Sequence, residues 1–445
     1  MNREITELGA YPYRAVAHLY VTFPDGSVAL GTGALVGRND VLTATHVLYN
    51  PDAGGWARDV RIALGADYNT ATYRYESPSL VDLHGSRWDA YGFPAQTFAD
   101  GANQTLTFTE SQSDVALIGL SVAAGDQLGY FAMAPGYDSS QVAYQIGYPQ
   151  GSSGMIYGAL SVQHNASYAV YQAYTGGSNQ LMGPGSSGGP LFVFDNGVPT
   201  IIGVRSSGND TSAYWADVGY SYPQLVSAMA ANDELLPVWM ASSVVSGTAG
   251  NDVLYATNSA DQVSGRDGLD TLVFASPHTQ YRVVLGAEGA VVASRALSDD
   301  VDHLIDVERL SFSDGVLAID VGPGEAAGGA YRLYQSAFDR QPDVGGFNYW
   351  IQRIDAGMSL RDVAQSFVDS IEFGARYGTQ VSNEQLITNF YLNVLDRSPD
   401  PGGYAYWQTQ MRSGLSEADV LGLFAESTEN QIRVIGALDE GVWLS

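Results

Sequence analysis

The stretch Gly183-Pro184-Gly185-Ser186-Ser187-Gly188-Gly189-Pro190-Leu191 decides the fold of the first half of this chain. It places Ser187 in a glycine-rich turn, and an apolar segment, predicted to be a strand, follows directly. Glycine permits sharp bends and close backbone approaches that other residues do not. Such a turn can direct the backbone N–H groups of Gly185 and Ser187 at one point, which is the arrangement of an oxyanion hole.

Two upstream segments supply the partners that a nucleophilic serine needs. His46 ends the second of two short predicted strands, and Asp114 precedes the apolar segment 115–120. A serine hydroxyl attacks only when a base takes its proton; histidine titrates near neutral pH, and a carboxylate orients its ring. We therefore predict that Ser187 is the nucleophile, His46 the general base and acid, and Asp114 the orienting group. Taken singly, each residue also fits a structural role, as a turn residue, a strand-end histidine or a strand cap.

In this order, His46, Asp114 and Ser187 resemble the triad of the trypsin-like (chymotrypsin-fold) serine endopeptidases, and the chain is most similar to their bacterial glutamyl endopeptidase branch. The resemblance covers about residues 10–235. It implies an all-β double-barrel domain that hydrolyses peptide bonds through an acyl-enzyme without a cofactor for catalysis. Ser186 stands where many such enzymes carry an aspartate that pairs with a newly cut N-terminus, so we expect that activation switch to be missing.

The same resemblance suggests where the substrate side chain binds. Leu181 stands where trypsin carries a carboxylate, which argues against cleavage after Lys or Arg. The segment 201–208 matches a pocket wall, which assigns Arg205, Ser206 and Gly208 to substrate binding. Glutamyl endopeptidases bind the substrate carboxylate with a histidine at the position of Arg205, and arginine can form two parallel hydrogen bonds to a carboxylate. The alternative to binding of a substrate carboxylate, with equal weight, is that Arg205 pairs with an acidic side chain of the protein itself.

Composition limits the classes of function. The chain has 445 residues, with 20 Lys and Arg against 48 Asp and Glu, and a formal net charge of −28. This charge argues against a nucleic-acid partner and fits a protein that binds cations. There are no cysteines, so stability must come from packing or metal. We expect no transmembrane segment, because no apolar run approaches the length that spans a bilayer. The first residues also lack the apolar core of a cleavable signal peptide.

From Gly247 the sequence repeats with a nonapeptide period. The repeats resemble the repeats-in-toxin nonapeptide, which implies a parallel β-roll that binds calcium. We expect about one structural calcium ion there; the predicted ligands are Asp252, Asp267 and Asp270. The side chains expected to point inward are Val253, Leu254, Val263 and Leu272. A degenerate β-linker without metal is the alternative.

The last third of the chain contains an internal duplication, in which 334–350 matches 391–407 without a gap. Each copy reads as helices joined by a D-R-x-P-D-x-G-G loop, with Asp343 and Asp400 as predicted N-caps. The copies resemble a domain of uncharacterised function found beside repeats-in-toxin segments in secreted bacterial proteins. We expect an accessory module for a cell-surface or matrix ligand. Its loop acids, Trp350 and Trp407 are expected to serve its own packing, and binding of calcium or a glycan by them is the alternative.

We therefore predict three domains: a trypsin-like protease domain (1–238), a calcium-binding β segment (239–321) and a helical tandem-repeat domain (322–445). The acidic and then apolar end, 439–445, resembles the signal that the type I secretion machinery reads. The predicted protein is a secreted, extracellular serine endopeptidase that acts on a protein or peptide and prefers acidic residues at the cleaved position. The alternative is a catalytically silent adhesin or matrix-binding protein. A narrowly selective peptidase and an esterase use the same triad, and the substrate and oligomeric state stay open.

Overall fold

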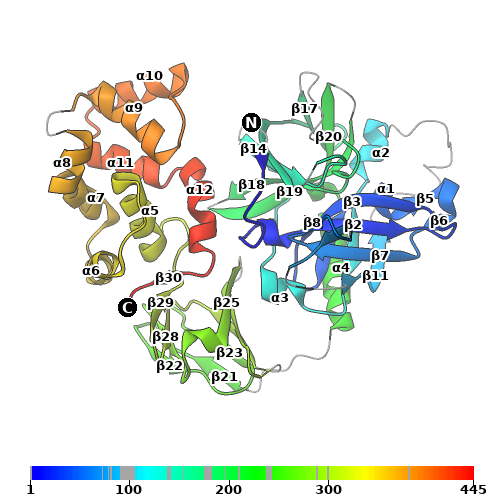
Figure 1. Cartoon of the computed structure of the whole chain (residues 1–445), viewed down its shortest axis with the longest axis horizontal. Helices are drawn as coiled ribbons and strands as arrows, with labels where there is room; N and C mark the ends of the chain where they lie inside the picture. Colours follow the sequence, from blue (N-terminus) through cyan, green and yellow to red (C-terminus); the bar gives the residue numbers. More distant parts are fainter. Residues whose placement is uncertain are drawn as a thin grey trace. The chain divides into compact units, whose positions relative to one another are not determined.

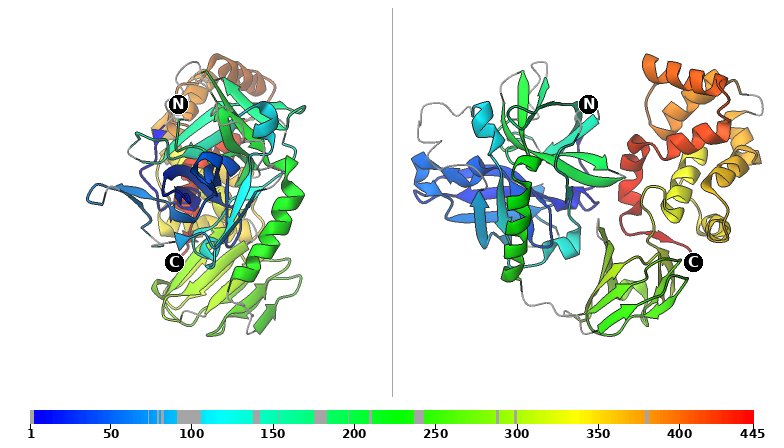
Figure 2. Two further views of the ribbon diagram at one scale, coloured as in Figure 1. Left: turned by 90° about the vertical axis from the view of Figure 1, so that its right-hand side faces the viewer. Right: turned by 180° about the vertical axis from the view of Figure 1, so that it is seen from behind.

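The computed structural model spans Met1–Ser445 and divides into two compact units, Met1–Met240 and Ala241–Ser445. Figure 1 and Figure 2 show the elements of each unit, coloured along the chain. The structure describes all residues except 1–2, 73, 79, 81–82, 91–105, 138–141, 153, 175–182, 196, 209–210, 237–242, 287–288, 298–299 and 379–380.

The first sheet of the N-terminal unit is antiparallel and carries the predicted histidine strand in its interior. Hydrophobic side chains such as Leu19, Val41 and Ile118 are completely buried and form its core. Its strands run in the order β10 (Leu83–His84), β7 (Asp59–Leu64), β2 (Val16–Thr22), β3 (Val28–Leu35), β4 (Asp40–Thr43), β12 (Ala116–Gly119) and β11 (Arg87–Ala90).

The second sheet of this unit, drawn mainly in green in Figure 1, carries the strand that follows the serine turn. Leu191, Ile202 and Trp215 are buried in its core. Its order is β1 (Arg3–Glu4), β15 (Ile156–Ser161), β14 (Val142–Gly147), β18 (Pro190–Asp195), β19 (Val198–Gly208), β20 (Ser212–Asp217), β17 (Val170–Tyr174) and β16 (Gln163–Asn165), with β13 (Ala132–Met133) parallel to β19. The predicted two-sheet, all-β architecture of the first domain is confirmed.

Short elements complete the unit. The strand that was predicted to end at His46 stops at Thr43, and His46 lies in the helix α1 (Thr45–Leu48), so its predicted place in the strand is wrong. The backbone N–H of His46 donates to the Asp114 carboxylate and, among the described residues, to no neighbouring strand. The helix α2 (Phe108–Gln112) precedes β12. The other elements are the helices α3 (Ala124–Leu128) and α4 (Tyr222–Asn232) and the strand pairs β5 (Tyr49–Asn50) with β6 (Gly55–Trp56) and β8 (Asp67–Asn69) with β9 (Arg74–Glu76).

A buried carboxyl makes the stability of this unit depend on pH. Asp40 is 2% exposed and accepts a hydrogen bond of 2.8 Å from Asn232. Burial raises the pKa of Asp40 to about 7, so ionisation favours the unfolded state between about pH 4 and pH 7. We expect the free energy of unfolding to fall over this range, by at most about 4 kcal/mol. Urea unfolding at pH 5 and pH 8 measures this change in the free energy of unfolding. In D40N the free energy of unfolding should depend less on pH. A D40N profile as steep as that of the wild type would show that Asp40 is not the cause.

The β part of the second unit is a roll of parallel strands. Each of the first strands pairs with the strand two nonapeptide units further on: Val245 pairs with Val263, and Leu254 with Leu272. One sheet runs β21 (Ser243–Ser246), β23 (Asp261–Ser264), β27 (Val301–Ile305), β26 (Gly289–Ser294) and β25 (Tyr281–Gly286). The other runs β22 (Val253–Tyr255), β24 (Thr271–Val273), β28 (Arg309–Phe312), β29 (Gly315–Ala318) and β30 (Val442–Trp443).

The interior of this roll is apolar, as the nonapeptide pattern predicts, except at one position. Val263 and Leu272 are fully buried, and Leu254 packs against the same core. Val253 is 61% exposed, so its predicted inward direction is wrong. Successive strand residues point to opposite faces, and Leu254 takes the inward place.

The duplicated segment folds into two matching sets of helices, so the all-α class predicted for the C-terminal domain is confirmed. Asp343 and Asp400 cap α6 and α10, each accepting a hydrogen bond of 2.8 Å from a backbone N–H. The first set is α5 (Ala326–Phe338), α6 (Val344–Asp355), α7 (Leu360–Val368) and α8 (Ile371–Tyr377). The second set is α9 (Asn383–Val394), α10 (Pro401–Arg412), α11 (Glu417–Ala425) and α12 (Thr428–Leu438).

The repeated loop is used for packing within each copy. Arg340 forms an ion pair of 3.0 Å with Glu372, and Arg397 one of 2.6 Å with Glu429. Trp350 packs edge-on against Phe367, and Trp407 packs against Phe424 at the corresponding positions of the second copy. Among the residues that the structure describes, no helix is long and apolar enough to cross a membrane.

Candidate active site

The histidine and aspartate of the predicted triad are in direct contact. His46 lies in α1, and Asp114 lies between α2 and β12. The distance from His46 Nδ1 to Asp114 Oδ2 is 2.6 Å, and the backbone N–H of His46 donates to Asp114 Oδ1 at 2.9 Å. The carboxylate is fully buried, whereas the imidazole is 23% exposed. A proton held on Nδ1 by this carboxylate leaves Nε2 as the acceptor that a general base requires.

Ser206 belongs to the same hydrogen-bond network. Its hydroxyl donates to Asp114 Oδ2 at 2.6 Å and is buried. The register of β19 against β20 shifts between Arg205 and Ser207, and a bulge of this kind re-aims the side chain that it carries. Ser206, which sequence analysis assigned to substrate binding, therefore contacts the orienting carboxylate.

The serine turn depends on its glycines. Gly185 and Gly188 have φ values of 91° and 82°, which residues with a Cβ rarely adopt. A Cβ on Gly185 would lie 2.5 Å from the carbonyl oxygen of Tyr148, and one on Gly188 would lie 2.3 Å from that of Thr32. The backbone N–H groups of Gly185 and Ser187 donate to none of the residues that the structure describes. Both N–H groups are therefore available to an oxyanion.

Thr32 holds the serine turn against the first sheet, a role that sequence analysis missed. Its backbone N–H donates to the carbonyl of Ser187 at 2.8 Å, and its hydroxyl donates to the carbonyl of Gly185 at 2.8 Å. The same hydroxyl accepts from the backbone N–H of Tyr148 at 3.0 Å. Thr32 is fully buried. Its side chain therefore fixes Gly185, one of the two residues predicted to donate to an oxyanion.

Removal of the Thr32 hydroxyl should disturb the position of the Gly185 N–H without unfolding the domain. T32V keeps the shape but leaves the Gly185 carbonyl and the Tyr148 N–H without a partner, at a cost of about 1–3 kcal/mol. We expect kcat to fall about 10–100-fold with little change in KM, as measured on a peptide substrate. T32S, which retains the hydroxyl, should preserve most of the activity. Equal kcat for wild type and T32V would contradict the role.

The serine turn lies beside the start of α1, the helix that carries His46. A Cβ on Gly188 would be 3.0 Å from the backbone nitrogen of Ala44, just before His46 in the chain. The N–H of Gly188 donates to the carbonyl of Arg205 at 2.8 Å, which ties the turn to β19. Within the described residues, the Ser187 hydroxyl makes no hydrogen bond with His46; such bonds often tighten only when substrate is present.

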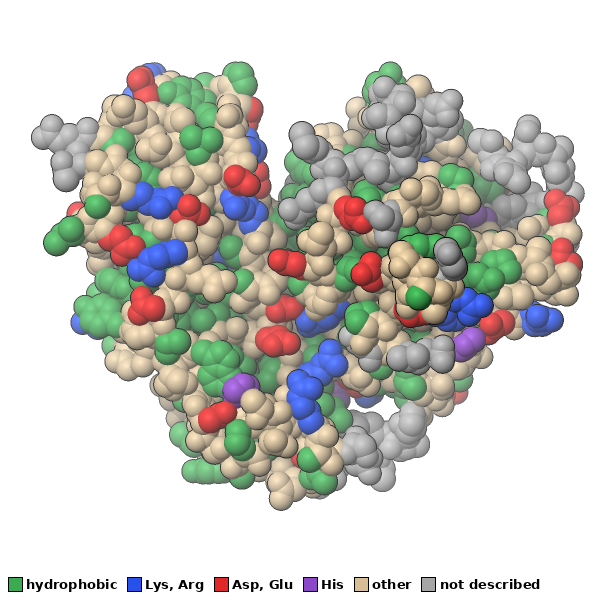
Figure 3. Space-filling view, in the orientation of Figure 1, with side chains coloured by type: hydrophobic (Ala, Val, Ile, Leu, Met, Phe, Trp, Pro, Cys, Tyr) green, Lys and Arg blue, Asp and Glu red, His purple; other side chains and the backbone are tan. Residues whose placement is uncertain are grey.

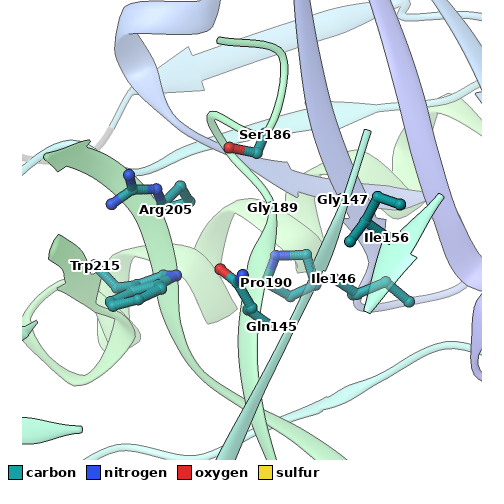
Figure 4. Close-up of a pocket in the computed structure, with 9 residues that line it drawn as sticks. All are labelled: Gln145, Ile146, Gly147, Ile156, Ser186, Gly189, Pro190, Arg205 and Trp215. Atoms are coloured by element: carbon teal, nitrogen blue, oxygen red, sulfur yellow. The ribbon is translucent and has the colours of Figure 1, made fainter. Parts of the chain in front are cut away.

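Arg205 lies in a small pocket beside the serine turn (Figure 4). Its guanidinium stacks 5.2 Å from the ring centre of Trp215 and donates to the carbonyls of Ser207 and Tyr214. The side chain is buried, and the desolvation lowers the pKa of Arg205 to about 10, which keeps it charged at neutral pH. The lining residues are Gln145, Ile146, Gly147, Ile156, Ser186, Gly189, Pro190, Arg205 and Trp215.

The other predicted substrate-side residues have different surroundings. A Cβ on Gly208 would lie 2.8 Å from Arg205 Nη2, so this glycine leaves room for the guanidinium. The hydroxyl of Ser186 donates to the carbonyl of Gly183 at 2.6 Å and closes the turn locally. Leu181 lies outside the described residues.

The predicted metal ligands are only partly brought together. The backbone N–H of Asp252 donates to Asp270 Oδ1 at 2.7 Å, so these two coils are adjacent. Asp270 is fully buried, and its second oxygen has no hydrogen-bond partner. Asp267 is exposed in the intervening turn. In the described ranges, no three side chains of Asp, Glu, His or Cys gather as a metal site.

Comparisons with known proteins find similarity in two parts of the chain. Residues 31–204 match the trypsin-like peptidase domain, and 330–373 and 364–434 match a domain of unknown function, DUF4214. A glutamyl endopeptidase of Bacillus licheniformis is 26% identical over 188 residues, 42% of this chain and 51% of that protein. An extracellular metalloprotease of Bacillus subtilis is 39% identical over 72 residues, 16% of this chain and 22% of that protein.

The chain thus spans about half the length, or less, of the curated relatives that it matches. A solved Glu endopeptidase structure aligns with 20% identity and a TM-score of 0.38, covering 52% of this chain and 96% of the other. The segment 31–204, which contains His46, Asp114 and Ser187 and ends within β19, is similar to the trypsin-like peptidase domain.

Proposed function

We propose that this protein is a serine endopeptidase. The observation that carries the proposal is the buried network around Asp114, whose carboxylate accepts from His46 twice and from Ser206 once. This network fixes the imidazole beside a turn whose glycines and free N–H groups suit an oxyanion. A binding protein that merely kept the fold would have no need of either feature.

In the proposed reaction Ser187 Oγ attacks the scissile carbonyl carbon while Nε2 of His46 takes its proton. The N–H groups of Gly185 and Ser187 stabilise the charge on the carbonyl oxygen. His46 returns the proton to the leaving amine, which departs and leaves an acyl ester on Ser187. Water then attacks this ester with His46 as base, which releases the acid and restores the serine. Asp114 keeps its hydrogen bond to Nδ1 and stabilises the imidazolium.

We also propose that the enzyme prefers Asp or Glu at the cleaved position. Arg205 supports this preference, because its buried guanidinium is a positive charge that a substrate carboxylate would stabilise. Arg205 lies close to the serine turn, since Ser186 and Gly189 line the same small pocket. The competing role for Arg205 is internal, since it already donates to backbone carbonyls.

Digestion of a mixed peptide library tests both proposals. Wild type should cleave predominantly after Asp or Glu, and S187A should not cleave. R205Q should cleave more slowly and lose the acidic preference by at least about tenfold, the size expected for a charge-assisted pair of about 1.5–3 kcal/mol. Cleavage after apolar residues only would reject the role of Arg205, and absence of cleavage by folded wild type would reject the peptidase.

We propose further that calcium stabilises the β-roll. The buried oxygen of Asp270 that lacks a partner is the supporting observation, because a buried carboxylate is costly unless it is compensated. A Cβ on Gly265 would lie 2.5 Å from this oxygen and 1.8 Å from the carbonyl oxygen of Asp306, so a second hard donor is near. Asp252 of the neighbouring coil would be a further calcium ligand. Asp267 would join these ligands after a rearrangement of its turn.

Calcium should therefore raise the melting temperature of the second unit. At 100 times the dissociation constant, the gain is about 2.7 kcal/mol, which corresponds to several degrees. Differential scanning calorimetry with calcium, with magnesium and with a chelator measures it, and D270N should remove the difference between calcium and chelator. Identical melting in all three solutions would reject the calcium site.

We propose that the protein acts outside the cell. The acidic composition and the proposed calcium-binding roll support this location, and one matched relative is described as extracellular. Export by the type I machinery, through the segment 439–445, is the proposed route. On the face seen in Figure 3, basic side chains lie singly or in small groups among acidic ones, which suits a partner other than nucleic acid. Export that persists after deletion of the last thirty or so residues would reject this route.

A further inference from the structure

The two copies of the helical repeat bury the corresponding face differently. In the first copy, the face of α5 and α6 is apolar, and Ala327, Tyr331 and Phe347 are buried. The helix α12 covers it through Val434 and Leu438, which belong to the same core. This face is therefore closed by the chain itself.

In the second copy the equivalent face, on α9 and α10, is polar and open. When the two copies are aligned, Glu384, Thr388 and Tyr404 stand where the first copy has Ala327, Tyr331 and Phe347. The helix α8, which corresponds to α12, ends at Tyr377, and Gly378 has a φ of 98° that breaks the helix. The shorter helix leaves a cavity of about 390 Å³ at this place.

The cavity has the chemistry of a site for a neutral, hydroxyl-rich ligand. Its described lining includes the aromatic rings of Tyr377 and Tyr404, the hydroxyl of Thr388 and the side chains of Glu384 and Asn389. The amide of Asn389 and the hydroxyl of Tyr404 form no hydrogen bond with any residue that the structure describes. Both are therefore free to bind a ligand, and an amide both donates and accepts.

Other ligand classes fit less well. None of the described lining residues is Lys, Arg or His, so the cavity offers no charge to an anion. Glu384 is the single carboxylate among the described lining residues, and one carboxylate is too few to hold a metal ion. Its side chain lies 3.4 Å from the amide of Gln408. The volume is at the lower end of the range for small-ligand sites, about 300–1,000 Å³.

We propose that this cavity, between the end of α8 and the helices α9 and α10 (Figure 1), binds one or two sugar rings of a neutral carbohydrate. The hydroxyls of the sugar bond to Asn389, Thr388 and Glu384, and its apolar ring face packs on Tyr404, which is only partly buried. The site is independent of the peptidase chemistry. It would give the helical domain a carbohydrate-binding role beside the proteolytic unit.

Saturation-transfer NMR with full-length S187A protein tests the proposal without self-digestion. The probes are maltotriose, cellotriose, mannotriose, galactobiose and chitotriose, each at millimolar concentration. At least one should bind, and Y404A and N389A should each weaken its affinity at least tenfold. Y406A is the matched control, because Tyr406 lies on the same helix, is 55% exposed and is outside the cavity; it should bind as S187A does.

Two results would overturn the proposal. One is that none of the five oligosaccharides binds to protein whose circular dichroism and melting show that it is folded. The other is binding that Y404A and N389A leave unchanged, or that Y406A weakens as much as they do. Because the measurement uses S187A, failure of the peptidase proposal does not affect it.

Discussion

S187A should lose peptidase activity by a factor of about 10⁴–10⁶ while its fold stays intact. The hydroxyl is the atom that forms the acyl bond, so no neighbouring group can replace it. The side chain makes no hydrogen bond to any described residue, and its loss removes no structural contact of that kind. Single-turnover cleavage of a fluorogenic peptide, followed by melting of the same sample, measures both quantities.

S186A is the matched control for this variant. Ser186 is the adjacent serine of the same turn, and its hydroxyl donates to the carbonyl of Gly183. Its replacement should cost at most about 1 kcal/mol of stability and leave kcat within a factor of a few. If S186A lost activity as completely as S187A, the assignment of the nucleophile to Ser187 would fail.

D114N should lower kcat by about 10⁴ with a small effect on KM. The carboxylate accepts from His46 Nδ1 at 2.6 Å and from the Ser206 hydroxyl at 2.6 Å. An amide at this position presents N–H donors, which favours the histidine tautomer whose proton is on Nε2. That tautomer cannot take the proton of Ser187.

The pH profile separates this mechanism from a general loss of structure. If D114N acts through the tautomer, its residual activity should rise with pH as hydroxide replaces the missing base. S206A should show a smaller loss of about 10–100-fold, since it removes one hydrogen bond of about 1.5–3 kcal/mol to the carboxylate. Full activity of D114N would show that His46 needs no orienting carboxylate.

Much of the fold could be predicted from local sequence patterns. The short apolar segments before His46 and after Asp114 and Ser187 indicate strands, because a short apolar run bounded by turn residues is typical of a buried strand. All four residues of β4 and of β12 are buried. The resemblance of the nonapeptides to repeats-in-toxin units implied parallel strands, and these strands pair across every second unit. The prediction failed at Val253, since two adjacent apolar residues do not reveal which one points inward.

The contacts that position the site could not be predicted in this way. Thr32 bonds to Ser187 and Gly185, which are far from it along the chain, and nothing in its own segment indicates that pairing. Ser206 reaches Asp114 because a bulge shifts the register of β19, and bulges depend on the neighbouring strand. The burial of Arg205 against Trp215 likewise follows from the packing of two strands. The roles of these residues stay predictions until they are tested.

The most direct test of the central claim is labelling of the folded protein with a fluorophosphonate, which reacts with serines activated by a general base. Intact-mass spectrometry and peptide mapping should find one adduct per chain, on Ser187. H46A should react much more slowly than the wild type, because no base takes the proton of the Ser187 hydroxyl. A folded wild-type protein that stays unlabelled, or that carries the adduct on another residue, would contradict the account.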